Sequence, residues 1–122
     1  MFESGRGVAR SNEEAVEWYR KAADQGHAGA QHNLGIMHKH GRGVAQSDEE
    51  AVQWYRKAAD QGDADAQHNL GVMFQNGRGV AQSDEDAAEW YRKAADQGHM
   101  VAQCRLAQVL SADRGTAHAE VE

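Results

Sequence analysis

The sequence predicts an all-α fold, a superhelix (solenoid) of stacked antiparallel helix hairpins. The first observation is a fixed period, because the aromatic pairs Trp18-Tyr19, Trp54-Tyr55 and Trp90-Tyr91 stand 36 residues apart. The second is apolar spacing at i, i+3, i+4 and i+7, which is typical of one helix face, in both halves of each unit. The third is glycine after each half, where a helix ends. A period of this length is typical of a repeat array in which one supersecondary unit stacks on copies of itself.

The first half of the central unit, residues 28–62, predicts a helix that we call A. One face of that helix carries Ala30, Leu34, Met37 and His38. Gly41-Arg42-Gly43 follows, and glycine adopts backbone angles that other residues avoid. Helix A is therefore expected to end there in a turn.

The second half predicts a helix that we call B. Ser47 is placed as an N-cap, and Glu50 three residues later completes a capping box. Acidic residues in this first turn interact favourably with the positive end of the helix dipole. The apolar face carries Ala51, Trp54, Tyr55, Ala58 and Ala59. Gly62 follows the helix as a stop.

Applied along the chain, the pattern gives about six helices in the order B-A-B-A-B-A. We expect a single domain over residues 1–112 and a frayed tail over 113–122. The domain divides into a partial repeat 1–27, full repeats 28–63 and 64–99, and a partial repeat 100–112. The first B helix is expected to begin near Asn12, and the last A helix to end near Ala112.

A single hairpin cannot bury its own apolar face, so neighbouring hairpins must share one core. Each aromatic ring can bury ~150–250 Å², which makes the Trp-Tyr pairs the expected centre of that core. Replacing Trp54 with Ala is expected to cost ~3–5 kcal/mol. The predicted structural core is Trp18, Tyr19, Leu34, Trp54, Tyr55, Leu70, Trp90, Tyr91 and Leu106.

Composition and charge exclude several classes of protein. At 122 residues, with 40% hydrophobic and 26% charged residues, the chain is an ordinary globular domain. A formal charge of −6 argues against nonspecific nucleic-acid binding. No apolar run reaches the ~20 residues of a membrane span. One cysteine, without a signal sequence, favours the cytoplasm. A secreted or periplasmic location stays open for the case in which an upstream segment precedes Met1.

The repeat also resembles a known family. The run from Ala30 to Val44, A-x-x-x-L-G-x-x-H-x-x-G-x-G-V, and the run from Ala51 to Gly62, A-x-x-W-Y-x-K-A-A-x-Q-G, are similar to the Sel-one-like repeat (SLR). That family is a branch of the tetratricopeptide-like α/α solenoids. His38 departs from the usual tyrosine, and Ala45 stands where proline is common. As a core residue, His38 would be polar and would loosen its unit.

The resemblance implies a right-handed superhelix whose A helices line a concave groove, and a non-catalytic role as an adaptor or scaffold for protein–protein interaction. The wall of the groove is then expected to consist of A-helix residues that do not belong to the packing face. Asn33 and Asn69, at its edge, are expected to hydrogen-bond an extended backbone. The expected partner-binding residues, which we call the A-helix stripe, are His32, Asn33, Ile36, Lys39, His40, Asp65, His68, Asn69, Val72, Gln75, Asn76, Val101, Cys104 and Gln108.

The sequence gives little support for zinc binding, catalysis or phosphate binding. His32, His68 and Cys104 recur one repeat apart, but layers ~8–10 Å apart do not converge on zinc, whose ligands lie at ~2.0–2.3 Å. Cys104 has no His–Asp arrangement to activate it. The Gly-Arg-Gly turns lack the Gly-Lys-Ser/Thr ending of a phosphate loop. We therefore expect no enzyme, no catalytic residue, no metal and no cofactor.

Two functions remain in competition. The first is a scaffold that binds a protein or peptide segment along the A-helix groove. The alternative is a self-assembling structural module that dimerises through uncapped solenoid ends, where Val16 and Tyr19 are expected to be partly exposed. The first predicts a monomer, and the second a weak homodimer.

Overall fold

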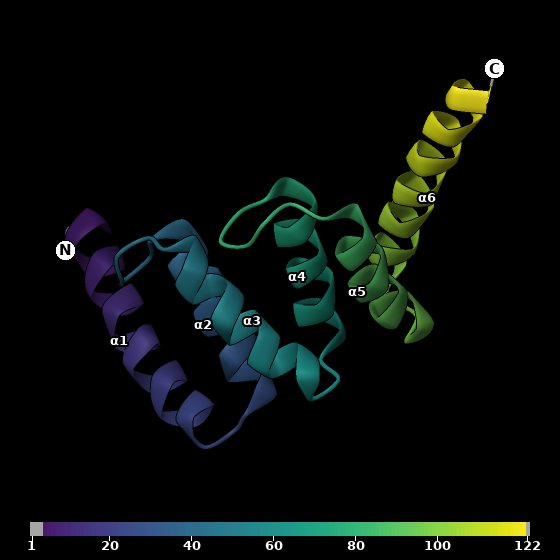
Figure 1. Cartoon of the computed structure of the whole chain (residues 1–122). Helices are drawn as coiled ribbons and strands as arrows, with labels where there is room; N and C mark the ends of the chain where they lie inside the picture. The colour runs from purple at the N-terminus through teal and green to yellow at the C-terminus, as the bar shows by residue number, and fades with distance from the viewer. Residues whose placement is uncertain (1–3, 122) are drawn as a thin grey trace.

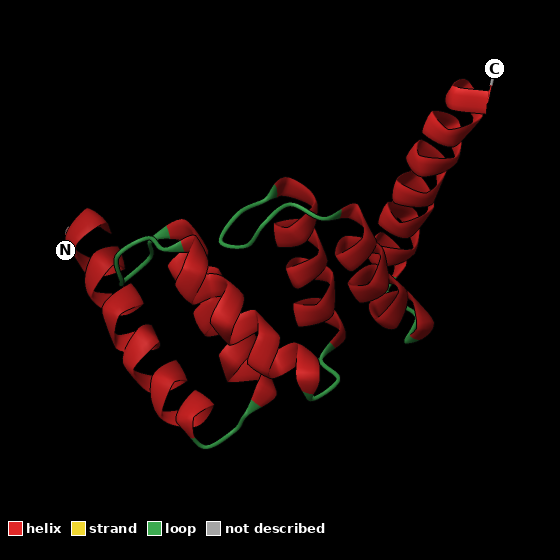
Figure 2. Ribbon diagram, in the orientation of Figure 1, coloured by secondary structure: helices red, strands yellow, loops and turns green. Residues whose placement is uncertain are grey.

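The computed structural model describes residues 4–121, with side chains described from 11 to 112. Within that part the chain is all-helical and has no strand (Figure 1, Figure 2). The helices are α1 (Ser4–Asp24), α2 (Ala28–His40), α3 (Asp48–Asp60), α4 (Ala64–Asn76), α5 (Asp84–Asp96) and α6 (Met100–Val121). The prediction of stacked hairpins in the order B-A-B-A-B-A is confirmed: α1, α3 and α5 are B helices, and α2, α4 and α6 are A helices.

The helix ends repeat from unit to unit. The Ser47 hydroxyl accepts a hydrogen bond from the Glu50 backbone N–H at 3.2 Å, and Ser83 does the same for Asp86 at 3.1 Å. These N-caps hold the start of α3 and of α5, as predicted. The A helices end at Gly41 and Gly77, whose φ angles of 68° and 66° are left-handed and favour glycine.

Two glycines inside the A helices explain how closely A and B pack. A Cβ added at Gly35 would lie 2.6 Å from the Tyr55 ring, and one at Gly71 would lie 2.6 Å from the Tyr91 ring. Such contacts are impossible, so glycine is required where the tyrosine crosses the neighbouring helix. The two hairpins α2–α3 and α4–α5 are closed by these contacts.

The core is built on the tyrosines and not on the tryptophans. Tyr55 and Tyr91 are 1% and 0% exposed, and Leu34 and Leu70 are fully buried. Trp54 and Trp90 are only half-buried. Each has a lysine three residues later lying over its ring, at 4.5 and 4.4 Å from the ring centroid. Neighbouring helix positions point about 100° apart, so only one member of each Trp-Tyr pair faces the A helix.

At the two ends, the predicted core is less complete. Trp18 is 66% exposed, which contradicts its prediction as a core residue, and Tyr19 and Leu106 are half-buried. The reason is the number of neighbours: α1 packs mainly on α2, and α6 on α5, whereas the helices between them pack on two. Val16, which the alternative function expected to be partly exposed, is buried at 6%.

The terminal helices are also longer than predicted. α1 begins at Ser4, so Gly5-Arg6-Gly7 and Ser11 lie inside a helix. α6 continues to Val121, where a frayed tail was expected, and its far end projects from the stack (Figure 1). In complete repeats, a Cβ at the second turn glycine, Gly43 or Gly79, would lie 2.5 Å from a backbone oxygen of the preceding B helix. This contact holds the turn, and α1 has no such preceding helix within the described residues.

Buried glutamines join successive repeats, a role that no motif in the sequence indicated. Gln31 Nε2 donates to the Ala23 carbonyl at 3.1 Å, and Gln67 Nε2 donates to the Ala59 carbonyl at 3.2 Å. Both side chains are 5% exposed. Each glutamine therefore satisfies a carbonyl near the end of the preceding B helix, where helices leave acceptors unpaired.

Candidate interaction surface on the A helices

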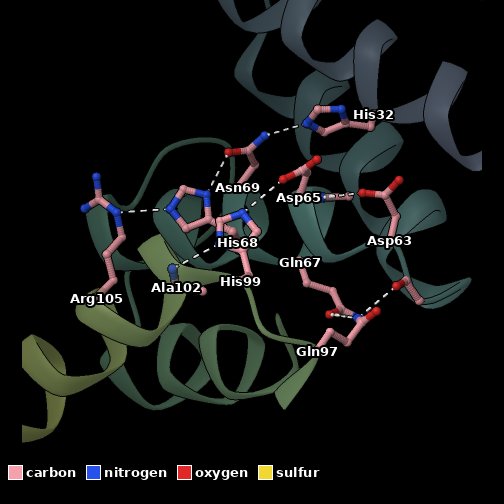
Figure 3. A network of polar contacts seen from close by, with 12 residues as sticks. His32, Asp63, Asp65, Gln67, His68, Asn69, Gln97, His99, Ala102 and Arg105 are labelled. Atoms are coloured by element: carbon pink, nitrogen blue, oxygen red, sulfur yellow. Dashed lines mark hydrogen bonds and ion pairs between the residues drawn. The ribbon is translucent and has the colours of Figure 1, made fainter. Parts of the chain in front are cut away.

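A chain of polar contacts runs across the three A helices (Figure 3). Asn69 Nδ2 on α4 donates to His32 Nε2 on α2 at 2.9 Å. The Asn69 Oδ1 atom lies 3.1 Å from His68 Nδ1. Arg105 Nε on α6 donates to His68 Nε2 at 3.1 Å. These bonds fix His68 as the neutral tautomer with its proton on Nδ1, because its Nε2 must accept.

His99, the cap residue before α6, packs on the outer side of this chain. Its ring stacks on His68 with centroids 4.9 Å apart. His99 Nε2 lies 3.0 Å from Asp65 Oδ1, and its Nδ1 accepts from the Ala102 backbone N–H at 3.1 Å. His68 is thus held between an imidazole and a guanidinium, in a layer that joins α4 to α6.

The buried tyrosines support the same face from beneath. The His32 and Tyr55 rings lie 6.0 Å apart, and the His68 and Tyr91 rings lie 5.9 Å apart. The Tyr91 hydroxyl donates to Gln75 Oε1 at 2.7 Å. His32, His68 and Gln75 are therefore positioned by contacts with the core tyrosines.

Burial and neighbouring charges lower the pKa values of His68, Lys39 and His40 on this face. Burial lowers the pKa of His68, and His99 and Arg105 lower it further, against the Asn69 hydrogen bond and Asp65, which raise it. Burial also lowers the pKa of the Lys39 ammonium. Arg78 and Arg105 add to that lowering, and Asp48 opposes it. Cationic groups thus act on one another across this surface.

The A-helix stripe predicted from the sequence separates into four groups, one of which, Asn33, Lys39 and Gln75, is half-buried. His32, His68 and Asn69 are brought together as described. Ile36 and Val72 are half-buried and pack against the core. The exposed members are His40, Asp65, Asn76, Val101, Cys104 and Gln108. The prediction that this stripe binds a partner is not tested by these positions and stays a prediction.

Asn69 and Cys104, two polar members of the stripe, differ in their contacts. Each of the two amide atoms of Asn69 makes one hydrogen bond within the protein, which leaves one N–H and one oxygen lone pair, so its bonding to a peptide backbone stays a prediction. On α6 the residue that continues the contacts of His32 and His68 is Arg105 and not Cys104, which is exposed. The two bonds between A helices, Asn69–His32 and Arg105–His68, each span 37 residues, one more than the repeat, and this offset could have identified Arg105.

His38 is a polar residue in the core, as the sequence suggested. It is 7% exposed, and both of its ring nitrogens are buried without a hydrogen-bond partner. Phe74 fills the equivalent place in the next repeat at 9% exposed. A buried polar group without a partner is unfavourable by about 1–3 kcal/mol.

The described residues form neither a metal-binding cluster nor a membrane span. Among side chains from 11 to 112, no group of three His, Cys, Asp or Glu is arranged to hold a metal ion. Within residues 4–121, no helix combines the length and apolarity that crossing a membrane requires.

Comparison with known proteins places the repeat. The family model of the Sel1 repeat matches residues 1–27, 28–63 and 64–99. The chain belongs to the Sel1 repeat family. No protein of curated function matches the chain. Sel1 repeat proteins are generally protein-interaction scaffolds and typically have no catalytic role.

Solved structures show the same fold. A Sel1 repeat protein from Oxalobacter formigenes is similar with 42% identity and a TM-score of 0.74, over 77% of this chain and 39% of that one. A protective antigen of uropathogenic Escherichia coli with an SLR fold has 44% identity and a TM-score of 0.70, over 71% and 19%. Cysteine-rich protein B of Helicobacter pylori has 21% identity and a TM-score of 0.72, over 83% and 90%. This chain thus spans well under half the length of the first two.

Proposed function

We propose that this Sel1 repeat chain is a scaffold that binds a peptide or protein segment along the A-helix stripe. The face crosses all three A helices, and its central side chains are held by the bonds among His32, Asn69, His68 and Arg105. A surface with pre-positioned side chains loses less conformational entropy when a partner binds.

The distribution of differences between the two complete repeats supports this proposal. Residues 41–62 and 77–98 differ only at Glu50/Asp86, Val52/Ala88 and Gln53/Glu89. The A-helix segments 27–40 and 63–76 are shorter than these segments, yet they differ at six positions. Four of the six involve stripe residues: Gly29/Asp65, Ile36/Val72, Lys39/Gln75 and His40/Asn76. The scaffold half is nearly constant, and the A-helix half carries the variation that would read a partner.

A peptide selection tests the proposal. Random peptides displayed on phage are selected on the folded protein, and the enriched peptides are titrated into isotope-labelled protein by NMR. We expect shift changes within residues 28–40, 64–76 and 100–112. The double variant His40→Ala with Asn76→Ala, both exposed, should weaken binding about tenfold or more, which is about 1.4 kcal/mol.

The matched control for this test is Arg92→Ala on α5, which is exposed on a B helix. It should leave peptide binding unchanged. Shift changes confined to α1, α3 and α5 would contradict the stripe as the binding surface.

The competing proposal, association through the solenoid ends, is favoured by one observation. Trp18 is 66% exposed and lines a surface hollow with Lys21, Gln25 and His27. One observation opposes an association in which α1 of one copy packs on α6 of another like a further hairpin. Ala107 on α6 stands at the position where Gly35 and Gly71 leave room for a tyrosine ring. Light scattering across a wide concentration range tests it, and a constant monomer mass would reject it.

A further inference from the structure

α1 carries the same apolar residues as the other two B helices, but one of its faces is open. Four positions that recur in every repeat as Ala, Trp, Tyr and Ala, at spacing i, i+3, i+4 and i+7, form this face. On α1 they are Ala15, Trp18, Tyr19 and Ala22, which we call the open face. The other apolar residues of this helix, Val16 and Ala23, are buried, and Gln31 of α2 binds the Ala23 carbonyl. One side of α1 is therefore already occupied by α2.

Burial separates the open face from its counterparts in α3 and α5. Tyr55 and Tyr91 are 1% and 0% exposed, and the alanines of the same faces are fully buried. On α1, Trp18 is 66% exposed and Tyr19 is only half-buried. α1 lies at one end of the stack (Figure 1) and, within the described residues, packs mainly on α2. The same four residue types are thus covered in the complete repeats and uncovered here.

The complete repeats show what covers such a face. In the first, α2 crosses Tyr55 at Gly35, where an added Cβ would lie 2.6 Å from the ring. Gln61 Nε2, just after α3, donates to Gln31 Oε1 of α2 at 2.7 Å. The pair α4 and α5 repeats both contacts. The covering helix therefore has glycine at the crossing point, directly after the buried Leu34, and a glutamine four residues before that glycine.

The open face already has the arrangement of its covered counterparts. A lysine three residues later lies over each indole, at 4.6 Å from the ring centroid of Trp18 and at 4.5 and 4.4 Å from those of Trp54 and Trp90. Trp18 also lines a surface hollow with Gln25, which is exposed and holds the place of Gln61. A surface that is formed before binding loses less conformational entropy when a partner arrives.

We propose that the open face of α1 binds a helix of another protein that carries the pattern Gln-x-x-Leu-Gly. The glycine lets this helix approach Tyr19, and the glutamine meets Gln25. An amphipathic helix that lies in an apolar groove is a common mode of recognition, and Trp and Tyr are among the residues that most often dominate binding energy. The site is separate from the A-helix stripe, so this inference does not rest on the proposed function.

A second copy of the chain fits this face less well. α6 is the A helix without a hairpin partner among the described residues, but it has Ala107 at the crossing position, where a Cβ leaves no room for the tyrosine. The A helices that do carry the glycine, α2 and α4, are already packed in hairpins with α3 and α5. We therefore commit to a helix from a different protein as the occupant.

A synthetic peptide with the sequence of residues 63–78 tests the proposal, because it contains the pattern as Gln67, Leu70 and Gly71. It is titrated by NMR up to millimolar concentration, since isolated helices of this length are only partly formed in water. We expect shift changes at the open face and at Gln25. The matched peptide carries Gly71→Ala. Alanine favours a helix more than glycine does, yet its Cβ meets the tyrosine ring, so this peptide should bind at least tenfold more weakly.

Two variants of the protein locate the site. Trp18→Ala removes an exposed ring and should weaken the binding of the 63–78 peptide at least tenfold. Glu17→Ala changes an exposed residue of the same helix on the side away from the open face, and it should change the affinity less than twofold. Circular dichroism and thermal melting check that both variants are folded.

Three results would overturn the inference. Equal binding of the two peptides would remove the requirement for glycine. Shift changes around Tyr91 without changes on α1 would show that the peptide replaces α4 in its hairpin. A mass that doubles with concentration in light scattering, and that stays monomeric in Trp18→Ala, would make a second copy the occupant. Shift changes confined to the A-helix stripe would also contradict the open face as the site, and they would leave the proposed function standing.

Discussion

The two complete repeats, 28–63 and 64–99, fold alike but differ in what their A helices hold. Their N-cap serines have nearly the same backbone angles, φ −157° with ψ 114° at Ser47 and φ −157° with ψ 111° at Ser83. In the first repeat, however, the core contains the unpartnered His38, and in the second it contains Phe74. The turn-and-B half is a constant frame, and the A helix is where one repeat is made different from the next.

The same comparison holds on the stripe. In the second repeat the Tyr91 hydroxyl is bound by Gln75, which leaves a neutral pair. In the first repeat Lys39 takes the place of Gln75, and it brings a cation to the equivalent position. One substitution therefore changes the charge of the surface without changing the frame beneath it.

The largest expected effect separates the tyrosines from the tryptophans. Tyr91→Ala removes a fully buried ring and should lower the free energy of unfolding by about 3–5 kcal/mol. Trp18→Ala removes a ring that is 66% exposed and should cost much less. Urea unfolding followed by circular dichroism measures both. An equal loss of stability in the two variants would mean that Trp18 contributes as much to stability as Tyr91.

The next largest effect exchanges the core residues of the two repeats. His38→Phe should stabilise the chain by about 1–3 kcal/mol, because it removes two buried nitrogens without partners. The reverse exchange, Phe74→His, should destabilise it by a similar amount. Thermal melting of both variants, with wild type as reference, checks the signs. A His38→Phe chain less stable than wild type would show that the imidazole is satisfied in solution.

A smaller effect on stability is expected when the pH is lowered. The pKa of His68 is lowered in the folded chain, by burial and then by His99 and Arg105, so the unfolded chain takes up this proton more readily. Stability should therefore fall as pH falls below about 6.5, the ordinary value for histidine. Protonation at Nε2 would also break the bond from Arg105.

Melting temperatures at pH 7.5 and 5.5 measure this effect. His68→Gln should reduce the loss between the two values. His32→Gln is the matched control, because the neutral Asn69 contacts His32 where Arg105 contacts His68. If both variants keep the wild-type pH dependence, the acid sensitivity arises elsewhere.

The smallest effect concerns the turns. Arg78→Ala breaks the Asp48 ion pair, whose side chains are 43% and 25% exposed, and should cost about 0.2–1 kcal/mol. Arg42→Ala, at the same place in the preceding turn, should cost less, because Asn12 stands there in place of Asp48. Unfolding in low and in 1 M salt measures the difference, which should shrink with salt. Equal losses would show that the pair adds no stability.

Much of the frame could be predicted from local sequence. The 36-residue period, the Ser47 and Ser83 caps and the stop glycines are local signals, because a cap or a left-handed glycine acts within a few residues of itself. The arrangement of the stripe could be predicted only in part. His32 and His68 were expected in one stripe, but the bonds that join them through Asn69 and extend to Arg105 depend on the offset between packed helices.

By itself, the sequence of this Sel1 repeat chain determined the helices, their order and their stacking, since these follow from a repeated apolar pattern and repeated caps. Only the tertiary structure decided which aromatic of each pair is buried, where the terminal helices begin and end, and which side chains meet on the A-helix face. These depend on what lies across each helix, and at α1 and α6 a neighbour is present on one side only. The same Trp-Tyr pair is therefore more deeply buried in α3 and α5 than in α1.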